Sequence, residues 1–219
     1  MNLDIERTRF NMVEQQVRPW DVVDLRVLDV LGRLRREDFV PEASRALAFA
    51  DVELPIGQGE CMMKPVLEGR LLQALSVQEG DSVLEIGTGS GFVTACLAAL
   101  SRDVTSVEIH ADLAAAAEAK LVRAGIANTR VQVADALKGF APDRSFDVIA
   151  VTGAVHREPQ PWRNWLAIGG RMFLIRGESP AMEAVLVTRI GANDYRELGL
   201  FETDLPYLKH AAPPKRFVL

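Results

Sequence analysis

The sequence predicts an α/β fold in which helices cover both faces of a mostly parallel β-sheet. After Gly80, short apolar segments alternate with helical patterns, and this alternation is typical of βαβ units with parallel strands. The apolar segments are nearly continuous, as expected for strands that are buried on both sides. The region before Gly80 is instead dominated by helical spacing, which predicts a separate helical part.

The N-terminal region, from about residue 10 to residue 75, is predicted to be mainly helical. In VVDLRVLDVLGRL, residues 22–34, apolar residues recur mostly at intervals of three and four, which predicts a helix with one buried face. Residues 51–60, DVELPIGQGE, are expected to form an irregular loop, because Pro55, Gly57 and Gly59 interrupt any period. A further helix is expected from about Pro65. Residues 1–75 are therefore predicted as a helical cap with a loop, and residues 76–219 as the core domain.

Seven segments of the core have the composition of strands. They are SVLEIG (82–87), VTSVEI (104–109), RVQVA (130–134), FDVIAVTG (146–153), RMFLIRG (171–177), EAVLVTRI (183–190) and YRELGLFE (195–202). Helices are expected over 91–101 and 111–124, the second ending before Gly125. The last two strands are joined by GAND, which predicts a hairpin and an antiparallel edge. The proline-interrupted tail 210–219 is expected to join a sheet edge or to pack down.

Two further features are expected to be structural. Arg33, Arg35 and Arg36 are expected on a solvated helix face with acidic partners. Trp162 and Trp165, three residues apart, are expected to pack a helix against the sheet.

Composition excludes several classes of function. The 219 residues carry a net charge of −5, which argues against nucleic acid and anionic membranes as partners. No segment has the roughly 18 uninterrupted apolar residues of a membrane span, and no signal peptide is apparent. The two cysteines form no metal-binding pattern, so no metal is expected and the cytoplasm is the predicted compartment.

The motif VLEIGTGSGF, residues 83–92, predicts a ligand-binding turn. Gly87, Gly89 and Gly91 follow the first strand of the core and precede its first helix, which is the position of nucleotide-binding turns. Glycine permits positive φ and leaves the backbone bare, and amides at a helix start favour an anion. The spacing G-x-G-x-G, with Glu85 before it, differs from the G-x-G-x-x-G of dinucleotide folds and argues against NAD.

Three acidic residues at the ends of successive strands favour a nucleoside ligand other than NAD. Glu85 suits an ammonium group such as that of the methionine part of S-adenosylmethionine. Glu108 lies 21 residues after Gly87, where a carboxylate meets ribose hydroxyls in this architecture. Asp135 ends the third strand, where it can accept a hydrogen bond from an adenine amino group. S-adenosylmethionine is therefore the predicted cofactor, with S-adenosylhomocysteine as its product.

Several longer segments resemble one family. MVEQQV, the segment from Asp24 to Gly59, VLEIGTGSGF, FDVIAVTGAV and LAIGGRMFLIRG together resemble the protein-L-isoaspartate O-methyltransferases, a branch of the class I S-adenosylmethionine-dependent methyltransferases. The resemblance implies a Rossmann-like sheet of seven strands with an N-terminal helical cap, and repair of proteins by methylation of isoaspartyl carboxylates. It also implies a set of cofactor-binding residues: Glu85, Gly87, Thr88, Gly89, Ser90, Gly91, Glu108, Ile109, Asp135 and Ala136.

The resemblance breaks at the active-site loop. Family members read Gly-Gln-Thr-Ile-Ser-Gln-Pro there, with hydroxyls that hold substrate and cofactor, whereas this chain reads GECMMKP. Met63 and Lys64 are the expected catalytic positions, and Cys61, Met62, Met63, Val155 and His156 are the expected substrate-binding positions.

Loss of the two hydroxyls leaves three alternatives open: an isoaspartyl carboxylate of a protein or peptide, a different acceptor such as a small molecule, or cofactor binding without catalysis. A carboxylate acceptor needs no general base, while a hydroxyl or nitrogen acceptor needs one, for which His156 is the candidate. His110 is expected at the adenine rim, and nothing in the sequence assigns a role to His210. The oligomeric state is not predicted.

Overall fold

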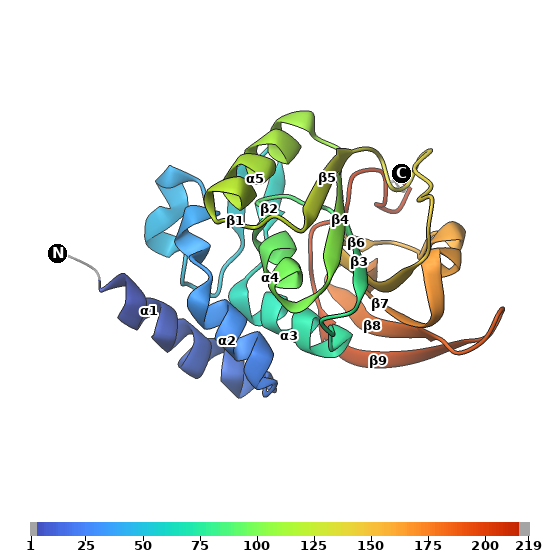
Figure 1. Ribbon diagram of the computed structural model, residues 1–219, viewed down its shortest axis with the longest axis horizontal. Helices are drawn as coiled ribbons and strands as arrows, with labels where there is room; N and C mark the ends of the chain where they lie inside the picture. The colour runs from blue at the N-terminus through green and yellow to red at the C-terminus, as the bar shows by residue number, and fades with distance from the viewer. Residues whose placement is uncertain (1–3, 215–219) are drawn as a thin grey trace, which may run out of the picture.

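A computed structural model describes residues 4–214 and contains one seven-stranded sheet with helices packed against it (Figure 1). The strand order is β5-β4-β3-β6-β7-β8-β9. Strands β5, β4, β3, β6 and β7 are parallel to one another. Strands β8 and β9 are antiparallel to their neighbours. The predicted α/β fold, the seven strands and the antiparallel edge are confirmed.

The strands of this sheet lie close to the predicted segments. Their bounds are β3 Ser82–Ile86, β4 Asp103–Glu108, β5 Thr129–Val133, β6 Phe146–Val155, β7 Leu166–Glu178, β8 Ala181–Arg189 and β9 Tyr195–Thr203. Chain order reverses at β3, which pairs with β4 on one side and with β6 on the other. In open α/β sheets, this reversal opens a crevice at the carboxyl ends of the strands.

The three helices predicted after residue 64 also match the structure. They are α3 Pro65–Leu75, α4 Phe92–Leu100 and α5 Ala111–Arg123. Gly125 follows α5 with a φ of 73°, a conformation that glycine adopts without a steric penalty. The remaining short helix, η5 Gln160–Trp165, brings both predicted tryptophans into the core, where Trp162 is fully buried.

The N-terminal region is helical, as predicted, but its helices are short. They are α1 Ile5–Asn11, η1 Met12–Val17, η2 Arg18–Trp20, α2 Leu25–Arg33, η3 Arg36–Asp38 and η4 Glu42–Leu47. Asp24 caps α2 by accepting a hydrogen bond from the Arg26 amide at 2.8 Å. The buried residues of α2 are Val27, Leu28, Val30 and Leu31, the face that the spacing predicts.

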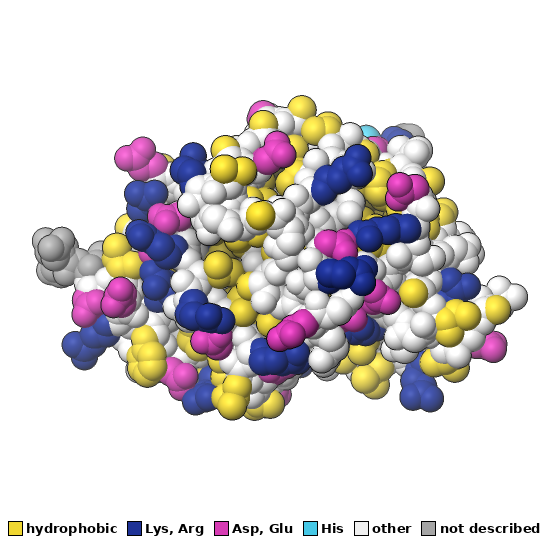
Figure 2. All heavy atoms as spheres, viewed as in Figure 1, with side chains coloured by type: hydrophobic (Ala, Val, Ile, Leu, Met, Phe, Trp, Pro, Cys, Tyr) yellow, Lys and Arg dark blue, Asp and Glu magenta, His cyan; other side chains and the backbone are white. Residues whose placement is uncertain are grey.

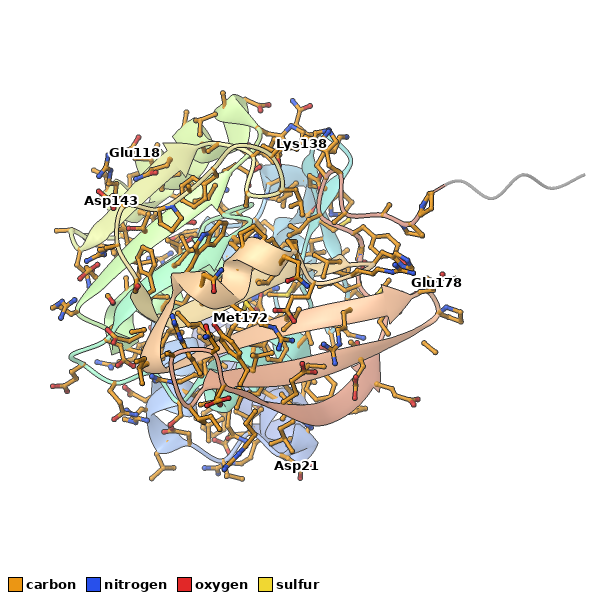
Figure 3. The ribbon with its side chains drawn as sticks, turned by 90° about the vertical axis from the view of Figure 1, so that its right-hand side faces the viewer. Asp21, Glu118, Lys138, Asp143, Met172 and Glu178 are labelled. Atoms are coloured by element: carbon orange, nitrogen blue, oxygen red, sulfur yellow. The ribbon has the colours of Figure 1, made fainter. Side chains whose placement is uncertain are left out.

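The two faces of the sheet are covered differently. One face packs with the N-terminal helices, α3 and α4 into a large hydrophobic cluster that contains Leu31, Leu71, Phe92 and Val83. The opposite face packs against η5, and Figure 3 shows this helix lying across the strands, with Met172 of β7 close to it. Apolar side chains of both faces are needed, which explains why the strands are almost continuously apolar.

The prediction of an irregular loop over residues 51–60 is wrong. Strands β1 Leu54–Gly57 and β2 Glu60–Met62 form an antiparallel hairpin. Gly57, Gln58 and Gly59 all have positive φ and make the turn. The glycines that were interpreted as breaks in regular structure are therefore the residues that let two short strands pair.

The expectation for Arg36 is also wrong. Its side chain is fully buried, and its guanidinium lies 3.0 Å from the carboxylate of Glu68, which is equally buried. Arg33 and Arg35 are exposed and paired with acids, as predicted. Figure 2 shows such basic and acidic side chains interspersed over one face of the molecule.

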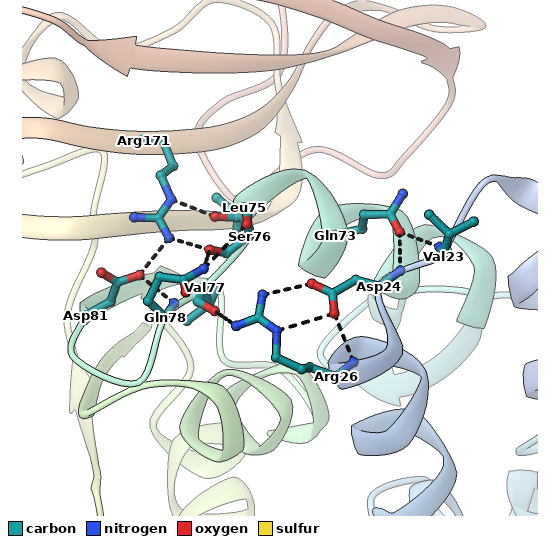
Figure 4. A network of polar contacts seen from close by, with 10 residues as sticks. All are labelled: Val23, Asp24, Arg26, Gln73, Leu75, Ser76, Val77, Gln78, Asp81 and Arg171. Atoms are coloured by element: carbon teal, nitrogen blue, oxygen red, sulfur yellow. Dashed lines mark hydrogen bonds and ion pairs between the residues drawn. The ribbon is translucent and has the colours of Figure 1, made fainter.

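A polar network joins the N-terminal region to the core (Figure 4). Gln73 of α3 accepts hydrogen bonds from the amides of Val23 and Asp24, and Arg26 donates to the carbonyl of Val77. Arg171 of β7 donates to the carbonyl oxygens of Leu75 and Ser76, at the end of α3, and to Asp81. The start of α2 and the end of α3 are thereby tied to the sheet.

The C-terminal segment packs down on the carboxyl ends of the strands, and residues 215–219 of the predicted tail lie outside the described residues. Within residues 4–214, no helix combines the length and hydrophobicity that crossing a bilayer requires.

Candidate active site

A cavity lies at the carboxyl ends of β3, β4, β5 and β6, where the strand order reverses. Its wall is formed by residues at and just after the ends of these strands, by the β1–β2 hairpin and by residues 205–209 of the C-terminal segment. Seven of the predicted site residues line it: Cys61, Gly87, Gly89, Glu108, Ile109, Asp135 and Ala136. The rule for open α/β sheets thus places the cavity where the sequence predicts a ligand.

The glycine turn forms the floor of the cavity. Gly87, Gly89 and Gly91 have φ values of 99°, 52° and 85°. A Cβ at Gly87 would lie 2.6 Å from the hydroxyl oxygen of Thr152, and one at Gly89 would lie 3.1 Å from Ile56. Glycine is therefore required both by the backbone conformation and by the space.

Thr88, Ser90 and Gly91 shape the turn without lining the cavity. The hydroxyl of Thr88 lies 2.5 Å from that of Ser106, and the hydroxyl of Ser90 accepts a hydrogen bond from the amide of Phe92. Gly91 precedes α4, and a Cβ there would lie 3.1 Å from Ala117 of α5. These three residues hold the turn in place.

Glu85 lies beneath the turn and is fully buried. Its Oε2 accepts hydrogen bonds from Thr94 and Ser106, while Oε1 has no hydrogen-bond partner among residues 4–214. Burial raises the pKa of Glu85 to about 8, although the two hydroxyls oppose this shift, so the carboxyl is mostly protonated at neutral pH. The structure does not bring its side chain to the cavity surface.

Glu108 connects β4 to the turn. Its Oε2 accepts a hydrogen bond from the amide of Gly89 at 2.8 Å, and its Oε1 accepts from the amide of His110 at 3.0 Å. Each oxygen keeps one lone pair for a further donor. The carboxylate is fixed by the backbone and faces the cavity, as an acceptor for a diol requires.

Asp135 occupies the equivalent place after β5. Its Oδ1 accepts from the amide of Leu137 at 2.9 Å, and its Oδ2 lies 2.7 Å from Nδ1 of His210. The neighbouring Ala136 is held by Trp162, whose indole nitrogen donates to its carbonyl at 3.2 Å.

The loop after β2 contributes less to the cavity than the sequence suggests. Cys61 lines it, and burial with the nearby acids Glu53 and Glu60 raises the pKa of its thiol. Met62 and Met63 point into the hydrophobic core, each with an exposed fraction of 4%. Lys64 precedes α3 and borders a separate cavity with Trp20 and Arg70.

A buried charge fixes this loop. Arg36 donates to the carbonyl of Met63 at 2.7 Å and to both carboxylate oxygens of Glu68 at 3.0 Å. Burial raises the pKa of Glu68, and the guanidinium of Arg36 opposes the shift. Arg36 therefore holds the loop through the backbone of Met63, and the side chains of Met62 and Met63 stay in the hydrophobic core.

Val155 and His156, at the end of β6, do not line the cavity. Val155 is fully buried. The His156 amide donates to the carbonyl of Ala211, and its ring nitrogen Nδ1 lies 3.9 Å from Glu178. His156 therefore helps to hold the C-terminal segment.

Several lining residues escaped the sequence analysis. They include Ile56, Glu60, Thr152, Gly153 and residues 205–209. Glu60 lies 3.2 Å from Nε2 of His110, which places His110 beside the cavity, close to where it was expected. The position of Thr152 near the end of a predicted apolar strand is a signal in the sequence, but nothing local in the sequence places the C-terminal segment there.

Known proteins resemble this chain over most of its length. The profile of the family "Protein-L-isoaspartate(D-aspartate) O-methyltransferase" matches residues 8–195. A protein-L-isoaspartate O-methyltransferase of Magnetococcus marinus is 40% identical over 87% of this chain and 83% of its own length. One from Methanoculleus marisnigri is 38% identical over 88% of both chains.

The fold comparison points the same way. The crystal structure of a putative protein-L-isoaspartate O-methyltransferase from Plasmodium falciparum, in complex with S-adenosyl-L-homocysteine, covers 92% of this chain and 98% of its own, with a TM-score of 0.80 at 18% identity. At that identity the likeness shows the fold. The profile match and the close relatives show the family: this chain belongs to the protein-L-isoaspartate(D-aspartate) O-methyltransferases.

Proposed function

We propose that this protein is an S-adenosylmethionine-dependent methyltransferase that methylates the carboxylate of isoaspartyl residues in proteins, as the first step of their repair. The observation that carries this proposal is the cavity over the glycine turn, with Glu108 and Asp135 at the ends of two neighbouring strands. Membership of the family adds the reaction, because the relatives bear the name of that activity.

The residues of the cavity fit the cofactor. A side chain at Gly87 would fill the floor, so this part of the wall is kept free of side chains. Glu108 would hold the ribose hydroxyls, Asp135 the adenine amino group, and Ile109 and Ala136 the faces of the base. Glu85 acts from below by fixing the turn through Ser106 and Thr94 rather than by direct contact.

The chain needs to supply little chemistry of its own. When bound, S-adenosylmethionine supplies an electrophilic methyl group on a sulfonium. An isoaspartyl carboxylate is already ionised at neutral pH, so no residue has to remove a proton. The protein's task is to align the acceptor and to exclude water, and alignment of this kind supplies a large part of many rate enhancements.

Cys61 is the proposed contact to the acceptor, because it is the loop residue that lines the cavity. The raised pKa keeps its thiol neutral at pH 7, so it does not repel a carboxylate. Met63 and Lys64 are also proposed, as the catalytic positions of the loop. Met63 would act through its backbone, since its side chain is buried. Met62, Val155 and His156 are proposed to support the acceptor site from behind.

The proposal is tested with a matched pair of peptides that differ only in an isoaspartyl or an aspartyl linkage. Labelled methyl from S-adenosylmethionine should appear as a base-labile ester in the isoaspartyl peptide and not in its isomer. Binding of S-adenosylhomocysteine without transfer to either peptide would favour another acceptor, such as a small molecule, or a protein that binds the cofactor without catalysis.

We also propose that the protein works in the cytoplasm on folded or damaged proteins. Both of its cysteines are free thiols, which suits a reducing compartment. Its net charge of −5 supports peptide or protein substrates over nucleic acid. Cell fractionation with an antibody to the protein tests the compartment.

A further inference from the structure

The C-terminal strap, defined as residues 204–211, crosses the carboxyl ends of the sheet. Its backbone is bound to β6: Ala154 donates to the carbonyl of Pro206 at 2.9 Å, and Leu208 donates to the carbonyl of Ala154 at 2.8 Å. The His156 amide donates to Ala211 at 2.8 Å. These bonds place the strap directly above the cavity, of which residues 205–209 form one wall.

The side chain of Leu208 rests on the glycines of the floor. Its Cδ2 lies 3.2 Å from the position that a Cβ of Gly87 would take, and 2.7 Å from that of Gly153. The strap therefore packs against the bare backbone that the turn offers to a ligand.

His210 fastens the strap at the adenine end. Its Nδ1 lies 2.7 Å from Oδ2 of Asp135, and the other oxygen of Asp135 accepts from the Leu137 amide. Both oxygens of the carboxylate are thus engaged by the protein. His210 has a φ of 69°, in the left-handed region that few residues other than glycine adopt, although histidine and asparagine adopt it more often than most.

The strap also limits the room beneath it. The cavity volume is about 70 Å³, whereas pockets that hold ligands of this size measure roughly 300–1,000 Å³. A nucleoside can enter at the Asp135 end only if the strap shifts away from the strand ends.

We propose that His210 acts as a latch that competes with the cofactor for Asp135. In the latched state, His210 holds Oδ2 of Asp135 and keeps Leu208 on the glycine turn. When the cofactor binds, its adenine amino group donates to Oδ2 of Asp135 in place of His210. The strap then moves away from the glycine turn. This inference rests on the proposed function, since it assumes that Asp135 receives adenine.

The test compares three versions of the full chain: the natural protein, His210→Ala and His210→Asn. Alanine removes the hydrogen bond to Asp135. Asparagine keeps a side-chain donor and tolerates the left-handed backbone, so it is the matched control. Binding of S-adenosylhomocysteine is measured by calorimetry, and its association rate by tryptophan fluorescence, since Trp162 contacts Ala136 of the cavity wall.

We expect His210→Ala to bind S-adenosylhomocysteine about three- to tenfold more tightly, the range for loss of one partly exposed polar contact that competes with the ligand. Most of the gain should appear as faster association. His210→Asn should stay within about twofold of the natural protein, and the melting temperatures should be alike because the His210 side chain is 39% exposed.

A second ligand tests whether Asp135 receives the adenine amino group. S-inosylhomocysteine presents an acceptor oxygen where adenine presents this amino group, but it also needs the strap to shift. We expect His210→Ala to improve its binding by a factor similar to that for S-adenosylhomocysteine, while its affinity stays below that of S-adenosylhomocysteine in both proteins. Equal affinities of the two ligands would show that Asp135 does not receive the amino group and would overturn the competition with His210.

Two other results would overturn the inference in distinguishable ways. Unchanged or weaker binding of S-adenosylhomocysteine by His210→Ala, with normal binding by the natural protein, removes the latch and leaves the proposed function intact. Failure of the natural protein to bind S-adenosylhomocysteine removes both.

Discussion

The glycine turn 87–91 and the loop 61–64 both belong to the region that the sequence marks as functional, yet they reach the cavity differently. The turn presents its backbone, and Gly87 and Gly89 line the cavity. The loop presents one side chain, Cys61, while Met62 and Met63 face the core. A site formed by the backbone can be located from the positions of its glycines. A site formed by side chains depends on the direction in which each side chain points.

Arg36→Ala gives the largest expected effect and tests how the loop is held. Removal of Arg36 leaves the buried Glu68 without its partner, which typically costs about 3–5 kcal/mol in the free energy of unfolding. Urea unfolding measures this change. Arg33→Ala is the control, because Arg33 is exposed and its ion pair contributes roughly 0.5 kcal/mol or less. Equal losses in the two variants would contradict the assigned role of Arg36.

Glu85→Gln tests the support beneath the turn through its pH dependence. The pKa of Glu85 is about 8 in the folded chain against an ordinary value of 4.5. Between these values the folded state binds more protons than the unfolded state, so stability is full at low pH and falls as the pH rises. The natural protein should lose about 2–3 kcal/mol between about pH 5.5 and 7.5 from this group.

The glutamine variant lacks this titration, so its unfolding free energy should fall less over the same interval. Urea unfolding of both proteins at a series of pH values gives the difference, in which the other titrating groups largely cancel. Parallel stability curves would show that Glu85 is ionised in the folded protein.

Gly87→Ala tests the backbone site directly. The new Cβ meets Thr152 at 2.6 Å, and a φ of 99° disfavours alanine. We expect binding of S-adenosylhomocysteine to weaken roughly ten- to hundredfold, since strain of this kind costs about 1–3 kcal/mol. Gly80→Ala is the calorimetric control, because no other atom in the part of the chain that the structure describes lies within 4 Å of its added Cβ. Normal affinity in Gly87→Ala would place the ligand elsewhere.

Cys61→Thr gives the smallest expected effect and tests the side-chain site. A hydroxyl at the cavity wall should lower the KM for an isoaspartyl peptide about two- to fivefold, the contribution of one hydrogen bond. Met62→Leu keeps the volume of a buried side chain and should leave KM unchanged. A KM that responds to Met62 and not to Cys61 would reverse the assignment of which residue faces the acceptor.

Most of the fold could be predicted because its signals are local. The seven strands and α3 to α5 follow from apolar runs, helical spacing and Gly125. The β1–β2 hairpin could not be predicted because its strands are short, β1 contains Pro55 and Gly57, and Gly59 lies in the turn. Arg36 was missed because its neighbours are solvated arginines and its partner, Glu68, lies 32 residues away in the chain.

The sequence by itself determined the order of strands and helices, the glycine turn and the acids at the strand ends, because each depends on neighbours in the chain. Only the tertiary structure decided that Met63 faces inward, that Glu85 is buried and mostly protonated, and that His210 meets Asp135 across 75 residues. Burial, pKa and contact between distant residues depend on what the folded chain brings together, and no local pattern carries that information.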